Sequence, residues 1–237
     1  MFLARLFKKK AGKRYFHPRS VVRDMVFVAS IVSVIFFDTF HWRFFAIGIT
    51  VFLIGGVMHL WCKACLVRNQ VVTTWGPYNI VRHPFYLANL FLDSGLCIAT
   101  GNTYLLAGYF VLFPVAYLPE MIAEEKKLIN IHGGQYQSYR DAVPGLLPYK
   151  IWRIFIKSPQ ECPYKSWAIL RKEHELPRLL RILSLPLLFP IGYNIIEIQN
   201  DTLHISHKLV FLAIFVVLNV VSRIWMRQIK KRFHKAS

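Results

Sequence analysis

Long apolar runs follow one another along this chain, separated by short segments that are basic or rich in glycine and proline. A helix needs about 20 mostly apolar residues to cross the hydrocarbon core of a bilayer, and the runs approach that length. They predict an all-α fold, a polytopic integral membrane protein with about six transmembrane helices. The predicted spans are residues 22–40, 44–62, 85–101, 104–122, 180–198 and 207–225.

Buried helices of a soluble protein are the other interpretation of such runs. Hydrophobic residues make up 55% of the 237 positions and charged residues 18%. A typical soluble domain has roughly 45–50% apolar and about 25% charged residues. Six apolar runs in a chain of this length leave too little polar surface to cover a soluble globule. The arrangement therefore favours a membrane protein.

The strongly basic balance, a formal net charge of +18, first suggests nucleic acid as a partner. Its distribution points elsewhere, because only Arg43 and Lys208 of the 30 Lys and Arg residues fall on one side of the six predicted spans. Basic residues concentrate on the cytoplasmic side of membrane proteins, so both termini are expected in the cytoplasm and nucleic acid is not expected. The first 20 residues lack the apolar core of a signal peptide. The expected location is a bacterial inner membrane or the endoplasmic reticulum.

The cysteines give no sign of a disulfide framework or of a metal site. Cys62 and Cys65 form a single CxxC at the end of a predicted span, without a second pair of ligands to complete a zinc site. No metal is therefore predicted.

The chain divides into three predicted parts. Residues 1–62 hold a basic N-terminus and an N-terminal transmembrane hairpin, and residues 63–150 hold polar loops and a central hairpin. Residues 151–237 hold an interfacial segment, a C-terminal transmembrane hairpin and a basic tail. The Trp, Tyr, Lys and Arg residues of the stretch 145–180 suit a helical segment that lies at the membrane interface.

Two polar segments break the hydrophobic pattern at the same face of the predicted membrane. Residues 76–86 place a turn, a basic pair and Pro84 directly before an apolar run. The free amides at such a helix start can bind an anionic group such as a carboxylate. The second segment begins with Glu124 and Glu125 at the end of a span. This carboxylate pair could bind the ammonium group or ribose hydroxyls of a cofactor, and a solvated, charged helix end is the alternative.

Together the two segments resemble the isoprenylcysteine carboxyl methyltransferase and phospholipid methyltransferase superfamily. The resemblance covers about residues 50–150 and rests on three ordered motifs, Arg82-His83-Pro84-x-Tyr86, Glu124-Glu125-x-x-Leu128 and Gly133-x-x-Tyr136-x-x-Tyr139. It implies that residues 63–150 are a methyltransferase core with cytoplasmic loops that bind S-adenosylmethionine, and that a lipid or lipidated acceptor arrives from the bilayer. Carried over position by position, the cofactor-binding residues are Gln70, Val71, Val72, Thr73, Tyr78, His83, Pro84, Phe85, Tyr86 and Glu124.

Arg82 and Glu120 are the candidate catalytic residues. Arg82 could orient an anionic acceptor, or it could be an ordinary topology-setting arginine at the end of a span. The resemblance leads us to expect an arginine four residues before Glu124, where this chain has Glu120. Because a carboxylate there would repel a carboxylate acceptor, Glu120 would better suit an amine head group, act as a base for a neutral acceptor, or merely cap the span. A lipid phosphate or acid could still bind through Arg82 or the basic segment 150–181.

Asp93 lies within the third predicted span, about two helical turns after Tyr86. Acids inside membrane spans are functional-site candidates by default. Asn89 and Ser94 are close in sequence, so both a structural polar cluster and a catalytic role are open for Asp93.

These observations predict an enzyme, an integral membrane S-adenosylmethionine-dependent methyltransferase that acts on a membrane lipid or lipid-anchored head group at the cytoplasmic face. One alternative is a prenylcysteine carboxyl methyltransferase. Another is an NADPH-dependent enzyme that resembles membrane sterol reductases, which have a similar Arg-His-Pro-x-Tyr region. A non-catalytic membrane scaffold or a transporter is the alternative outside the enzymes.

Overall fold

The structure, a computed structural model, describes residues 18–37, 39–66, 71–148, 175–193 and 202–234. Every regular element within these ranges is an α-helix or a short 3-10 helix, which confirms the all-α prediction. The helices are α1 (Pro18–Phe36), α2 (Trp42–Cys65), α3 (Pro84–Ala99), α4 (Thr103–His132), α5 (Gly134–Ala142), α8 (Glu175–Ser184), α9 (Leu188–Gly192) and α10 (Thr202–His234). The 3-10 helices are η2 (Gly76–Asn79) and η3 (Leu185–Leu187).

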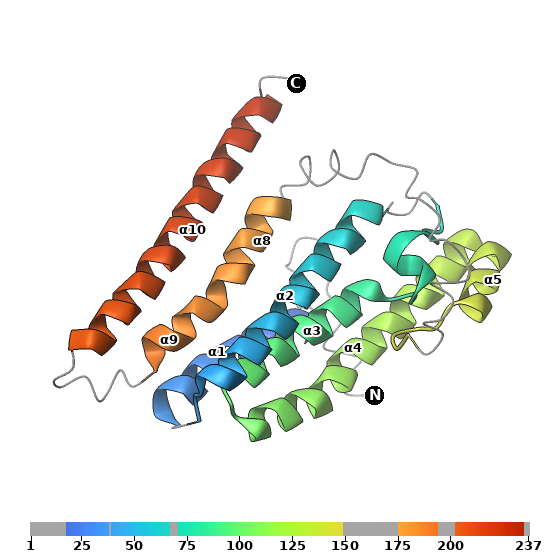
Figure 1. The fold of residues 1–237 in the computed structure, drawn as a ribbon. Coiled ribbons are helices and arrows are strands. Elements are labelled where there is room, and N and C mark those ends of the chain that lie inside the picture. Colours follow the sequence, from blue (N-terminus) through green and yellow to red (C-terminus); the bar gives the residue numbers. More distant parts are fainter. Residues whose placement is uncertain (1–17, 38, 67–70, 149–174, 194–201, 235–237) are drawn as a thin grey trace.

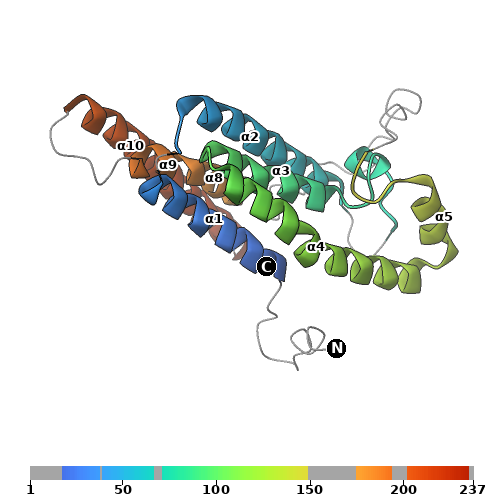
Figure 2. The ribbon, with the colours of Figure 1, turned by 90° about the horizontal axis from the view of Figure 1, so that it is seen from below.

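The helices form a bundle in which α1 to α4 pack together and α8 to α10 stand along one side (Figure 1). Seen from below, α4 continues past the ends of α2 and α3 and leads into α5 (Figure 2). Gly133 ends α4 with a positive φ of 53°, which turns the chain into α5. The extension of α4 therefore carries its last charged turns beyond the apolar part of the bundle.

Three helices in the described part of the chain are long and apolar enough to cross a membrane, namely α2, α4 and residues 208–226 of α10. The sequence predicted six spans, and the other three differ for identifiable reasons. Arg19, Arg23 and Asp24 interrupt the start of α1. Helix α3 has 16 residues, which corresponds to about 24 Å, against about 30 Å for a hydrocarbon core. The predicted span 180–198 is divided at Pro186 into α8, η3 and α9, and residues 194–198 lie outside the described residues.

Helices α2 and α3 approach each other closely because glycines line their contact. A Cβ atom added at Gly95 would lie 2.6 Å from the backbone nitrogen of Phe52 and 2.8 Å from the carbonyl oxygen of Gly48. A Cβ atom at Gly55 would lie 2.8 Å from the backbone nitrogen of Leu92. Small residues at such contacts allow the backbones of apolar helices to pack directly. This contact holds the end of α2 beside the start of α3, where the polar segments lie.

Substitution of Gly95 by alanine should destabilise the bundle, because its methyl group would press on the backbone of α2. We expect a loss of about 1–3 kcal/mol, typical of overpacking, and a melting temperature lower by several degrees. Circular dichroism of the protein in detergent measures this. Gly108→Ala is the matched control, since no atom lies within 4 Å of its added Cβ; the prediction is wrong if the two variants melt alike.

Candidate ligand pocket

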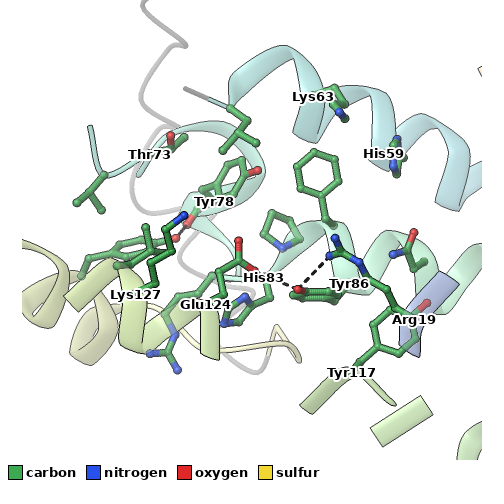
Figure 3. A pocket seen from close by; sticks show the side chains of 18 of the residues that line it. Arg19, His59, Lys63, Thr73, Tyr78, His83, Tyr86, Tyr117, Glu124 and Lys127 are labelled. Atoms are coloured by element: carbon green, nitrogen blue, oxygen red, sulfur yellow. Dashed lines mark hydrogen bonds between the residues drawn. The ribbon is translucent and has the colours of Figure 1, made fainter. Parts of the chain in front are cut away.

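A cavity of about 690 Å³ opens at the end of the bundle where α2 ends and α3 begins (Figure 3). This volume lies within the range of roughly 300–1,000 Å³ found for small-molecule sites. Helices α1, α2, α3, α4, α5 and α8 all contribute to its wall, together with η2 and the segment before it. The lining side chains are those of Arg19, Arg23, His59, Lys63, Leu66, Val71, Val72, Thr73, Tyr78, Arg82, His83, Pro84, Phe85, Tyr86, Asn89, Tyr117, Glu124, Lys127, Leu128, Tyr136, Tyr139 and Ile182.

The structure brings most of the predicted site residues to this one cavity. Arg82 lines it, and so do nine predicted cofactor-binding residues, Val71, Val72, Thr73, Tyr78, His83, Pro84, Phe85, Tyr86 and Glu124. Gln70 lies outside the described residues. Glu120 is not on the wall, and its carboxylate instead pairs with Arg19. The roles assigned to these residues stay predictions. Their position around a single cavity is a feature of the structure.

The η2 turn holds Tyr78 in the wall of the pocket. Gly76 adopts a positive φ of 59°, and a Cβ atom there would meet the sulfur of Cys65 at 2.7 Å, so the turn packs directly on the end of α2. The hydroxyl of Tyr139 donates to the carbonyl oxygen of Tyr78 at 2.6 Å. Glycine is the residue type that reaches this backbone conformation without strain.

The Tyr78 side chain is only 7% exposed, and its hydroxyl has no hydrogen-bond partner within the described residues. Burial raises the pKa of Tyr78 well above its usual range, so the group is a neutral donor at physiological pH. Burial likewise raises the pKa of Tyr136 to about 12. A buried hydroxyl without a partner normally finds one, and a ligand in the cavity would provide it.

Glu125 fastens the turn before α3 to α4 and α5. Its Oε1 atom accepts a hydrogen bond from Nε2 of His83 at 2.9 Å and lies 3.3 Å from Nη1 of Arg82. Its Oε2 atom lies 3.6 Å from Nε of Arg140 on α5. The Glu125 side chain is 17% exposed, so these contacts are largely shielded from water.

Backbone hydrogen bonds reinforce the same junction. The backbone N–H groups of Arg82 and His83 donate to the carbonyl oxygens of Pro144 and Gly145, at 2.8 and 3.0 Å. Pro84 then begins α3, where its missing N–H costs little. The turn is therefore fixed on both sides before the helix starts.

A chain of polar contacts crosses the pocket from α4 to α1. The hydroxyl of Tyr86 donates to Oε2 of Glu124 at 3.1 Å, and Nη1 of Arg19 donates to the same hydroxyl at 3.3 Å. Nε of Arg19 lies 3.2 Å from Oε2 of Glu120. Figure 3 shows Arg19, Tyr86 and Glu124 in this order along the wall. Helix α1 thus contributes a guanidinium group to a site that the sequence placed in residues 70–124.

The wall carries far more positive than negative charge. Among the described residues, five cationic side chains, Arg19, Arg23, Lys63, Arg82 and Lys127, share it with one carboxylate, that of Glu124. Clefts lined by one sign of charge concentrate ligands of the opposite sign. No group of three or more His, Cys, Asp and Glu residues that could hold a metal ion occurs in the described part of the chain. The cavity therefore suits a ligand with at least one anionic group.

Asp93 lies beneath the pocket and is 1% exposed. The hydroxyls of Tyr109 and Tyr117 on α4 both donate to its Oδ2 atom, at 3.3 and 3.4 Å. Tyr117 also lines the cavity. Asp93 thus links α3 to α4 through tyrosines that lie far from it in sequence, rather than through Asn89 or Ser94.

Sequence reasoning missed the contributions of Arg19, Arg23, Glu125 and Lys127. The two arginines stand four residues apart at the start of an otherwise mostly apolar helix, and this spacing was the available signal that they share one face. Glu125 was seen only as a neighbour of Glu124. Successive residues of an α-helix point about 100° apart, so the two carboxylates face different surroundings.

Two bacterial metal-resistance proteins are similar to part of this chain. It is 28% identical over 104 residues to the nickel-cobalt-cadmium resistance protein NccN of Alcaligenes xylosoxydans xylosoxydans. It is 27% identical over 104 residues to the cobalt-zinc-cadmium resistance protein CzcN of Cupriavidus metallidurans. The aligned part covers 43% of this chain in both cases, and 47% and 46% of the relatives, so the chain matches about half the length of each. No family model and no solved structure matches the chain.

These comparisons overturn the predicted family and function. The similarity found is to proteins of metal resistance and not to methyltransferases, so the prediction of a lipid methyltransferase of the isoprenylcysteine carboxyl methyltransferase superfamily is wrong. The two alternative enzymes, a prenylcysteine carboxyl methyltransferase and an enzyme that resembles sterol reductases, are overturned by the same finding. The structure gives a physical reason for the misleading motif. His83 binds Glu125, Pro84 begins α3 and Tyr86 binds Glu124, so the motif specifies a folded turn and not one kind of chemistry.

Glu125→Gln should destabilise the protein, because it removes the charge that three basic side chains share in a shielded place. We expect a loss of about 1–3 kcal/mol, measured as a lower melting temperature in detergent. Glu124→Gln is the matched control on the same turn, since Glu124 is exposed and has one hydrogen bond, to Tyr86. Equal melting temperatures for the two variants would contradict the role assigned to Glu125.

Proposed function

We propose that this chain is a membrane protein of a heavy-metal resistance system and that it binds a small organic ligand in the pocket. The similarity to NccN and CzcN, whose names tie them to resistance against nickel, cobalt, zinc and cadmium, carries the proposal. Since the match covers about half of each relative, the resistance role of the whole chain is part of what is proposed.

The charge of the pocket favours an organic ligand over a path for the metal itself. A divalent ion about 5 Å from one guanidinium group would be opposed by roughly 6–7 kcal/mol at an effective dielectric constant of about 20. The wall presents five cationic side chains and one carboxylate. We therefore propose that the chain supports metal resistance without carrying the metal ion through this pocket.

S-Adenosylmethionine is the ligand that we propose for the pocket, and three features of the wall support it. The basic side chains can bind its carboxylate, Glu124 can bind its ammonium group, and the rings of Tyr78 and Phe85 can pack on its adenine or face its sulfonium. The buried hydroxyl of Tyr78 adds a donor inside the cavity. An enzymatic use of this ligand and an acceptor from the bilayer stay predictions, and no lipid methylation forms part of the proposal.

The proposed topology places α1, α3 and the apolar stretch 179–192 in the bilayer beside α2, α4 and α10, with both termini in the cytoplasm. Arg43 and Lys208, the basic residues expected on the far side, lie near the starts of α2 and α10. These starts are neighbours, since the rings of Trp42 and Phe211 stack with centroids 6.0 Å apart. The pocket lies at the opposite end of α2 and would face the cytoplasm of a bacterial inner membrane. The division of the chain at residues 62 and 150 also stays a prediction.

Deletion of the gene from its host should lower the concentrations of nickel, cobalt, zinc or cadmium salts that arrest growth. The intact gene should restore tolerance, whereas Tyr78→Phe should restore it only in part if ligand binding matters. Growth curves at graded metal concentrations measure this, with membrane levels of each variant checked by immunoblot. Unchanged tolerance to all four metals in the deletion strain would sink the resistance role.

Calorimetric titration of the detergent-solubilised protein with S-adenosylmethionine tests the ligand separately. We expect binding that Glu124→Gln weakens about tenfold, or 1.4 kcal/mol, because the ammonium group loses its charged partner. Asp141→Asn removes one carboxylate from an exposed position on α5 outside the pocket and should leave binding unchanged. Absence of binding by the intact protein would exclude S-adenosylmethionine while leaving the resistance role to the growth test.

A further inference from the structure

Helix α1 brings two guanidinium groups to the side of the pocket that the sequence assigned to a carboxylate. Arg19 and Arg23 both line the cavity and stand four residues apart, which puts them on one face of the helix. Glu120, the residue expected to set the charge there, does not line the cavity. The groups that a ligand meets at this side are therefore guanidinium groups, with the carboxylate of Glu120 behind them.

Contacts with the described residues hold Arg19 in place without using all of its donors. Its Nε atom pairs with Glu120 at 3.2 Å, and its Nη1 atom donates to the hydroxyl of Tyr86 at 3.3 Å. A guanidinium group has five N–H donors in a planar fork, and these contacts occupy two of its nitrogens. The Arg19 side chain is 42% exposed, so a ligand in the cavity can reach the remaining donors. Figure 3 shows the group lying beside the Tyr86 ring at the α1 side of the cavity.

Arg23 extends the same surface by one helical turn. Its Nε atom lies 3.8 Å from the carboxylate of Asp24, and both side chains are more than half exposed, so the pair is weak. Two adjacent guanidinium groups with open donors match the planar oxygens of a phosphate or carboxylate, which arginine binds in a bidentate manner.

We propose that Arg19 and Arg23 form an anion-binding subsite that recognises a phosphate or carboxylate group on a ligand entering beside α1. Glu120 neutralises Arg19 while the subsite is empty and competes with the ligand's anionic group when it arrives. This differs from the three roles that the sequence left open for Glu120, namely to suit an amine head group, to act as a base or to cap the span. The subsite rests on the proposed function only in using the same cavity, and it is separate from the Glu124 side where the ammonium group of S-adenosylmethionine is placed.

The test uses the full chain in an uncharged detergent, with three probes at constant pH and ionic strength. Dihexanoyl phosphatidic acid carries an open phosphate, dihexanoyl phosphatidylcholine has the same tails with the phosphate capped by a cation, and inorganic phosphate has no tail. We expect at least tenfold tighter binding of phosphatidic acid than of phosphatidylcholine. Binding of inorganic phosphate as tight as that of phosphatidic acid would identify a soluble ligand. Much weaker binding of inorganic phosphate would identify a lipid head group, and both results support the subsite.

The variants separate a binding role for Arg19 from a structural one. Arg19→Gln and Arg23→Gln should each weaken phosphatidic acid binding about tenfold, whereas Arg43→Gln, which removes the same charge at the far end of α2, should not. Glu120→Gln should tighten binding a few-fold, because the carboxylate no longer competes for Arg19. Among the described residues Arg23 makes a weak pair with Asp24, so Arg23→Gln tests the subsite even if Arg19→Gln unfolds.

Three results would overturn the subsite. These are equal affinity of the intact protein for phosphatidic acid and phosphatidylcholine, equal effects of Arg23→Gln and Arg43→Gln, and weaker binding by Glu120→Gln. The last would show that the Arg19–Glu120 pair only ties α1 to α4. Binding of phosphatidic acid without binding of S-adenosylmethionine would sink the proposed ligand and leave the subsite standing. The converse would sink the subsite alone.

Discussion

The carboxylate of Glu125 joins three of the segments that form the pocket. It belongs to α4, it binds His83 and Arg82 in the turn before α3, and it reaches Arg140 on α5. Because successive residues on a helix point about 100° apart, Glu125 turns toward this junction while Glu124 turns toward the cavity. One turn of α4 therefore supplies both the anchor of the pocket and its single acidic wall residue.

The pairing of these carboxylates decides which charges face the pocket. Glu125 pairs with basic side chains around the turn before α3, and Glu120 pairs with Arg19. Of the three carboxylates in this stretch of α4, only that of Glu124 lines the cavity. The cations that meet the cavity come from four different helices or turns. Glu120 and Glu125 offset the charge of Arg19 and Arg82 from behind the wall, so the ligand meets the guanidinium groups and not these two carboxylates.

Local patterns predicted those parts of the structure that depend on local physics. The apolar runs placed the helices, and the proline and glycine punctuation placed the starts of α3 and α5. Nine of the ten predicted cofactor-binding residues, from Val71 to Tyr86 and Glu124, line one cavity. The short motif behind that success also led to the wrong family. A turn such as Arg82-His83-Pro84 has its own structural partners and can serve more than one chemistry.

What could not be predicted depends on contacts between distant segments. The charge of Glu120 suggested an amine ligand, but Arg19 lies about a hundred positions earlier and neutralises it. A polar cluster with Asn89 and Ser94 was one of two roles left open for Asp93, and its partners Tyr109 and Tyr117 lie on the next helix. Three of the six predicted spans correspond to helices that are long and apolar enough to cross a membrane. Residue counting did not register the charges at the start of α1 or the break at Pro186, so the other three spans stay predictions.

The order in which the chain is synthesised bears on how the pocket is assembled. Ile182 is the single lining residue that comes after Tyr139 among those that the structure describes, and α10 makes its main contacts with α8, η3 and α9. Helices α1 to α5, which carry nearly all of the described wall, are thus synthesised before α8 and α10. Sequence drift in α10 can change the contacts along the outside of the bundle while the side chains that meet the ligand stay the same.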